Sequence, residues 1–131
     1  MISNMAYIPY VTKEQYSQYG SADIPEDELE KRLRAASRHI DSLTFNRIVD
    51  KGFDSLTDFQ QEIIREVVSL QADFEYENAD EIETILSSYS INGVSAKFGD
   101  SWNIVTDMGV AIKRDTYELL KQTGLCCRLL R

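Results

Sequence analysis

The chain has 131 residues, of which 43% are hydrophobic and 10% aromatic, and its formal net charge at pH 7 is −8. This length and apolar content predict one globular domain with a core large enough to need no disulfide. The negative charge excludes ordinary nucleic-acid-binding proteins, which need a basic footprint. No apolar run approaches the roughly 20 residues of a membrane span, and the N-terminus has no signal-peptide pattern. We therefore expect a protein that folds in the cytoplasm.

The charge is unevenly placed along the chain. Residues 54–83 contain ten acidic residues and one basic residue, Arg65. Residues 113–131 contain five basic residues against Asp115 and Glu118. The middle of the chain is acidic and its C-terminal end is basic, and this asymmetry bears on mechanism more than the total charge does.

The first 24 residues are predicted to form an extended N-terminal arm. They carry four tyrosines, Pro9 and Gly20 without a sustained hydrophobic period, and only residues 13–16 suggest a helical turn. Aromatic side chains in such an arm pack either on their own domain or on a neighbour.

Two long helices are predicted next. Acidic residues after Pro25 suit a helix start, and this helix is expected over residues 25–49, with Gly52 as its stop. The spacing of Thr57 and Gln60 is that of a capping box and opens a second helix over residues 57–77. Apolar stripes at helical spacing comprise Leu29, Leu33, Ala36, Ile40 and Leu43 on the first helix, and Leu56, Phe59, Ile63, Val67, Leu70 and Phe74 on the second. The stripes meet only if the helices fold back as an antiparallel hairpin across residues 50–56.

The rest of the chain predicts a minor β element and a last helix. Residues 78–88 form either a break or a short third helix. Residues 89–105 alternate apolar and polar positions around Asn92-Gly93, a favoured hairpin turn, and predict a small hairpin or an ordered loop. The last helix is expected over residues 110–123 and ends at Gly124. The predicted fold class is mainly α: a small bundle built on the long helix hairpin, with a β-hairpin or loop insertion before the C-terminal helix.

No catalytic or metal-binding constellation stands out. His39 is the only histidine, so a nucleophilic triad would need distant partners. Cys126 and Cys127 are adjacent, which makes a bridge between them strained, and they lack further zinc ligands. Residues 73–77 lack the following glycine and the bidentate glutamate of a calcium-binding EF-hand loop. We therefore expect no enzyme activity, no cofactor and no bound metal.

Three charged or apolar features remain. The outer face of the first helix carries basic residues, namely Lys31, Arg32, Arg34 and Arg38. The opposite face of the second helix carries Asp58, Glu62, Glu66, Ser69 and Asp73, which form either a solvated face or a binding surface. The tail at residues 125–131 combines Leu125, Leu129 and Leu130 with Arg128 and Arg131. These tail residues either cap the helical core or dock on a partner.

Four segments, in this order, resemble phage head–tail connector (adaptor) proteins. They are YVTKEQY at residues 10–16, LRAASRHIDSLT at 33–44, YSINGVS at 89–95 and LLKQTGL at 119–125, the last followed shortly by Arg128. The similarity is closest to the YqbG-like prophage members and spans nearly the whole chain.

The resemblance implies a structural adaptor of a phage or prophage virion. Such a protein joins the portal protein at the head vertex to the tail or stopper protein, as a ring around the DNA channel. The location implied is the cytoplasm during assembly and then the head–tail interface of the virion. Asp58, Glu62, Glu66 and Asp73 would then line the channel, where carboxylates repel DNA phosphates at short range. The tail residues Leu125, Arg128, Leu129, Leu130 and Arg131 would bind the portal or a neighbouring subunit.

The alternative is a small acidic regulatory or DNA-mimic protein that binds a basic protein partner through its acidic helix. In both cases we expect no sequence-specific contact with nucleic acid and no membrane attachment. We also expect a monomer or a weak oligomer in isolation, because the net negative charge opposes assembly without a partner.

Overall fold

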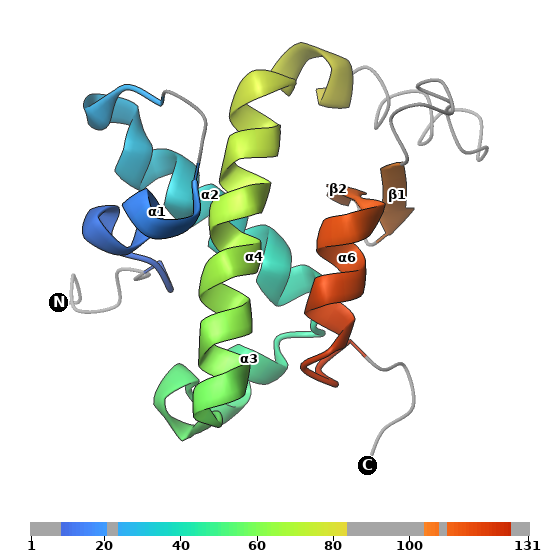
Figure 1. Ribbon diagram of the computed structural model, residues 1–131. Coiled ribbons are helices and arrows are strands. Elements are labelled where there is room, and N and C mark those ends of the chain that lie inside the picture. The colour runs from blue at the N-terminus through green and yellow to red at the C-terminus, as the bar shows by residue number, and fades with distance from the viewer. Residues whose placement is uncertain (1–8, 21–23, 84–103, 108–109, 127–131) are drawn as a thin grey trace, which may run out of the picture.

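The computed structural model describes residues 9–20, 24–83, 104–107 and 110–126 (Figure 1). In chain order the elements are helices α1 (Lys13–Tyr19), α2 (Glu26–Leu43) and α3 (Arg47–Lys51), a 3₁₀ turn (Phe53–Ser55), helix α4 (Asp58–Glu77), strands β1 (Ile104–Asp107) and β2 (Val110–Lys113), and helix α6 (Arg114–Lys121). A further helical stretch covers residues 79–83. The predicted fold class is confirmed: the described chain is mainly helical, with a small antiparallel hairpin before the C-terminal helix.

The N-terminal segment forms a helix where an extended arm was predicted. The Thr12 hydroxyl accepts a hydrogen bond from the Gln15 backbone N–H at 3.1 Å, and the Gln15 side chain accepts one from the Thr12 N–H at 3.0 Å. This capping box begins α1, which has seven residues and packs on α4. The sequence predicted only a helical turn at residues 13–16, whereas the helix covers residues 13–19. Residues 1–8 and 21–23 lie outside the described part of the chain.

The first long helix ends six residues earlier than predicted. Its last residue is Leu43, and Phe45 and Asn46 then adopt φ angles of 57° and 58°, in the left-handed region that stops a right-handed helix. The chain turns there into the short helix α3, and Gly52, which was predicted to stop the first long helix, ends α3 instead, with a φ of 87°. The turn brings Ile48 fully into the core, a burial that offsets the strain of two left-handed residues.

The pairing of α2 with α4 is confirmed. The Thr57 capping box is present, and α4 has nearly the predicted bounds. The fully or almost fully buried side chains of the pair are Leu33, Ala36 and Ile40 on α2 and Ile64, Val67 and Val68 on α4. Phe59 is an exception to the predicted stripe, because it is 55% exposed.

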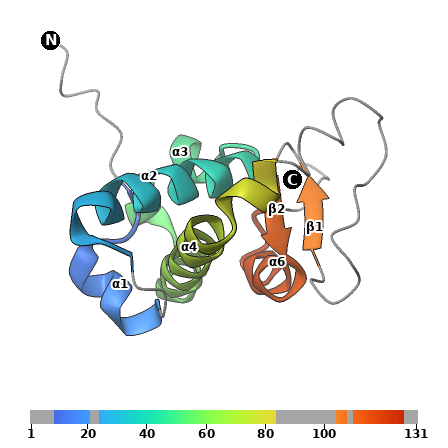
Figure 2. The same cartoon turned by 90° about the horizontal axis from the view of Figure 1, so that it is seen from above.

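Helix α4 is the centre of the molecule. It contacts α2, α6, α1 and β2. Seen from above, α2 lies on one side of α4, while α1 and α6 flank α4 towards the opposite side (Figure 2). The N-terminal half of α4 consequently keeps one open side, in front in Figure 1.

An antiparallel hairpin precedes the C-terminal helix, over residues 104–107 and 110–113. Strand β1 pairs antiparallel with β2, with Ile104 opposite Lys113 and Val105 opposite Ile112. Residues 110–113 were predicted as the start of the last helix, but Val110 and Ile112 are β-branched, suit a paired strand, and are buried against the helices. Asn92-Gly93, the predicted turn, lies outside the described residues.

Helix α6 and the turn that follows it close the core. α6 is confirmed from Arg114 onward, and Gly124 adopts the expected left-handed conformation, with a φ of 76°. The Thr123 hydroxyl donates to the carbonyl of Leu120 at 2.7 Å and accepts from the Leu125 N–H at 3.1 Å. This turn sends Leu125 back into the core, where it is 4% exposed.

Candidate interaction surfaces

The outward side of the N-terminal half of α4 forms the first candidate surface, here called the α4 acidic face. It consists of Asp58, Phe59, Glu62 and Glu66. Asp58, Glu62 and Glu66 follow one another at spacings of four and therefore line one side of the helix. Asp58 and Glu62 are exposed and Glu66 is half-buried, and Phe59 stands among them as one of two exposed large hydrophobic side chains in the described residues.

Asp73 does not belong to this face. It is 6% exposed and accepts a hydrogen bond from the Tyr16 hydroxyl of α1. Ser69 is fully buried as well and donates back to the carbonyl of Arg65 at 2.9 Å. Helix α1 covers this part of α4, so the predicted DNA-channel face shortens to Asp58, Glu62 and Glu66.

The outward side of α2 carries the second candidate surface, here called the α2 basic face: Lys31, Arg34 and Arg38. All three are exposed, and their spacings of three and four place them on one side of the helix. The exposed acidic residues Asp27 and Glu30 lie one turn before Lys31 and Arg34 on the same side, so this side of α2 carries charges of both signs. Arg34 lies 4.0 Å from Glu30, a contact too exposed to hold the side chain firmly. Arg32 points elsewhere: it contacts Glu28 at 3.4 Å and stacks on the Tyr76 ring at 5.5 Å.

Of the predicted tail at residues 125–131, Leu125 and Cys126 are described by the structure, and residues 127–131 are not. Leu125 belongs to the core, and its carbonyl accepts a hydrogen bond from Arg47 Nη1 at 2.8 Å. The Gln60 side chain donates to the carbonyl of Thr123 at 2.9 Å. The capping alternative therefore holds for Leu125, which is not available as a partner-binding residue. Arg128, Leu129, Leu130 and Arg131 lie outside the described residues.

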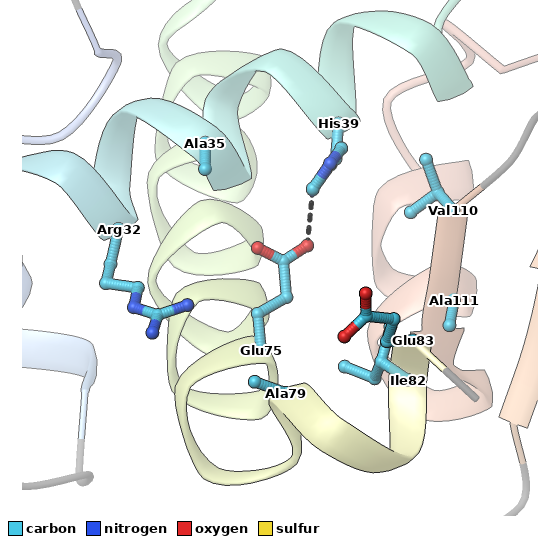
Figure 3. Close-up of a pocket in the computed structure, with 9 residues that line it drawn as sticks. All are labelled: Arg32, Ala35, His39, Glu75, Ala79, Ile82, Glu83, Val110 and Ala111. Atoms are coloured by element: carbon cyan, nitrogen blue, oxygen red, sulfur yellow. Dashed lines mark hydrogen bonds and ion pairs between the residues drawn. The ribbon is translucent and has the colours of Figure 1, made fainter. Parts of the chain in front are cut away.

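An ion pair that the sequence did not reveal joins α2 to α4. His39 Nδ1 lies 2.5 Å from Glu75 Oε2, beside a pocket of about 280 Å³ (Figure 3). The hydrogen bond to Glu75, with its negative charge, raises the pKa of His39 above 6.5 against the opposing effect of burial. The two residues are 36 positions apart, so no local pattern indicated that they would meet.

The polar contacts continue from Glu75 into the core. Gln71 is fully buried, and its Nε2 donates to Glu75 Oε2 at 2.8 Å and to the carbonyl of Ala111 on β2 at 2.9 Å. The network thus connects α2, α4 and the hairpin. The pocket beside it is lined by Arg32, Ala35, His39, Glu75, Ala79, Ile82, Glu83, Val110 and Ala111, none of which is a serine, threonine or cysteine nucleophile. The arrangement suits a structural link between elements better than a reaction centre.

Within the residues that the structure describes, no group of three or more His, Cys, Asp or Glu side chains is placed to hold a metal ion. No helix in this part of the chain has the length and apolar character that crossing a bilayer requires. Comparisons of the chain with models of protein families, with curated proteins and with solved structures found no match.

Proposed function

We propose that this protein is a structural adaptor of a phage or prophage virion, which joins the portal at the head vertex to the tail or stopper around the DNA channel. The observation that supports this best is where the family-like segments lie. Residues 10–16 contribute Val11 and Tyr16 to the core, residues 33–44 contribute the central part of α2, and residues 119–125 contribute Leu120 and Leu125. The three segments that the structure describes therefore contribute to one core, which favours a shared fold rather than scattered coincidences, and residues 89–95 lie outside the described residues.

The surfaces suit an assembly role. A ring subunit needs lateral contacts and one face towards the channel, and the acidic and basic faces provide charged sides of both signs. In the channel, Asp58, Glu62 and Glu66 would repel DNA phosphates within a screening length of about 8–10 Å at physiological salt, which lets DNA slide without adhering. The basic, leucine-containing residues after Cys126 would bind the portal.

Co-purification with a portal protein from the same phage or prophage genome tests the proposal. We expect the chain to elute with the portal ring in many copies, and a variant lacking residues 127–131 to lose this binding while it stays folded by circular dichroism. A folded parent chain that does not bind the portal at any ratio would exclude the adaptor role.

The α4 acidic face also favours a second candidate, a small acidic regulator or DNA mimic that binds a basic protein. Carboxylates around an exposed aromatic ring suit a basic partner surface with an apolar centre. The two candidates differ in stoichiometry, because a mimic binds a DNA-binding protein in one or two copies. Mass measurement of any captured complex therefore separates them.

A further inference from the structure

The pocket beside the His39–Glu75 pair lies where four parts of the fold meet. Its volume of about 280 Å³ is bordered by α2, the end of α4, the helical stretch at residues 79–83 and strand β2 (Figure 3). Alkyl groups form most of its lining, and they come from Ala35, Ala79, Ile82, Val110 and Ala111. An apolar cavity with a few polar groups that converge on it is typical of a site for a small ligand.

Glu75 supplies a buried carboxylate to this pocket. The residue is 9% exposed, and its Oε2 atom is bonded to both His39 and Gln71. Its other oxygen, Oε1, has no hydrogen-bond partner among the described residues. Glu75 also lies in the last turn of α4, where the helix dipole adds partial negative charge. A buried carboxylate with one oxygen still open favours a ligand group that donates hydrogen bonds and carries a positive charge.

Glu83 supplies a second carboxylate at the rim of the pocket. Its carboxylate points towards Glu75 (Figure 3), and within the described part of the chain Glu83 makes no ion pair or hydrogen bond. Two carboxylates directed at one space repel each other, and a cation placed between them replaces this repulsion with attraction. The space between Glu75 and Glu83 is therefore suited to a positively charged group.

The basic side chains that line the pocket already have acidic partners. Arg32 contacts Glu28 at 3.4 Å and lies over the Tyr76 ring at 5.5 Å, and His39 is paired with Glu75. When both pairs are counted as neutral, Glu83 still leaves the lining with a negative charge. A cationic ligand would be attracted by this charge, whereas an anionic ligand would be repelled.

From these observations we propose that the pocket binds an aliphatic primary amine in its ammonium form. The ammonium group would donate hydrogen bonds to Glu75 and Glu83, while its alkyl chain would contact Ile82 and Val110. The apolar lining suits an alkyl chain better than a hydrated metal ion. The proposal is independent of the adaptor function, which assigns portal binding to the residues after Cys126.

NMR titration of the full, isotope-labelled chain tests the site with pentylammonium, pentanol and pentanoate, which share one alkyl chain and differ in charge. We expect pentylammonium to cause saturating shift changes at the backbone amides of His39, Ala79, Glu83 and Ala111. Pentanol should bind about fivefold more weakly because it lacks the charge, and pentanoate should cause no saturating change. Pentanoate that binds as well as pentylammonium, or shift changes centred elsewhere, would overturn the proposal.

Variants separate the charge of the site from its volume. Glu83→Gln should weaken pentylammonium binding about fivefold and leave pentanol binding unchanged. The matched control, Glu81→Gln, removes the same charge at a neighbouring exposed position outside the lining and should change neither. Ala79→Leu fills the pocket from an exposed helical position and should abolish binding of both probes. Circular dichroism melts check that each variant is folded. Equal losses in Glu83→Gln and Glu81→Gln, or full binding to Ala79→Leu, would contradict the proposed site.

A blocked lysine distinguishes two sources of the ammonium group. N-acetyl-lysine N-methylamide carries the same type of alkylammonium chain on a peptide backbone. If it causes the same shift changes as pentylammonium, the site accepts a lysine side chain of a partner protein. If only pentylammonium binds, the ligand is a free amine. If neither probe binds the parent chain, the pocket is not an amine site.

Discussion

Tyr16 and Asp73 form the contact that turns the expected arm into part of the body. They are 57 residues apart, both are buried, and the Tyr16 hydroxyl donates to the Asp73 carboxylate. We expect Tyr16→Phe to lower the free energy of unfolding by about 2 kcal/mol, since it removes the donor from a buried carboxylate. Urea denaturation measures the change. Tyr19→Phe, on the same helix and less buried, is the control, and equal losses in both variants would show that the hydroxyl contact contributes nothing.

The His39–Glu75 pair predicts a pH dependence of stability. Because the folded-state pKa of His39 is raised above 6.5, protonated His39 stabilises the fold fully below that pH, and the contribution is lost as pH rises through the folded-state pKa. The His39 side chain is 43% exposed, so the effect should stay below about 1 kcal/mol. The unfolding midpoint of the parent should therefore decrease as the pH rises from mildly acidic to alkaline. The midpoint of His39→Gln should change less over the same range. Parallel pH profiles would contradict this assignment.

Among the helices, the buried positions of α2 and α4 should be highly sensitive to substitution by a charged residue. Ile40 and Val67 are both fully buried. We expect Ile40→Asp or Val67→Asp to unfold the domain, because each places a charge without a partner in an apolar interface, at a cost above about 4 kcal/mol. Circular dichroism melts measure this, with Val49→Asp as the control, since Val49 is 57% exposed. Variants at positions 40 and 67 that melt like the parent would disprove the pairing.

The C-terminal turn predicts two different truncation results. Removing residues 125–131 takes Leu125 out of the core and leaves Arg47 without its carbonyl acceptor, so the melting temperature should fall clearly. Leu125→Ala should show the same direction, with a loss of about 2–4 kcal/mol. Removing only residues 127–131 keeps every described core residue and should leave the melting temperature nearly unchanged. Equal melting temperatures for both truncations would show that Leu125 does not hold the turn.

At the scale of the whole molecule, charge sets the expected behaviour in solution. The net charge of −8 repels like copies. We therefore expect a monomer or weak oligomer at physiological salt. Light scattering across concentration and salt measures this. A stable large ring formed by the isolated chain at physiological salt would show that self-complementary surface outweighs this repulsion.

Local sequence patterns were enough to predict several parts of this structure. The capping box at Thr57, the apolar stripes of α2 and α4 and the left-handed Gly124 are local signals, and the structure has each of them. Their physical basis lies within one or two helical turns: hydrogen bonds to unpaired N–H groups, side-chain periodicity and backbone sterics.

Other features depend on long-range contacts, which no local pattern in the sequence indicates. Burial of Asp73 follows from the packing of α1 on α4, and the end of α2 at Leu43 follows from the burial of Ile48. Val110 and Ile112 lie in a strand because β1 pairs with β2. The charges on α2 and α4 are plain in the sequence, but which of them stay exposed follows from the way α1 and α2 pack on α4.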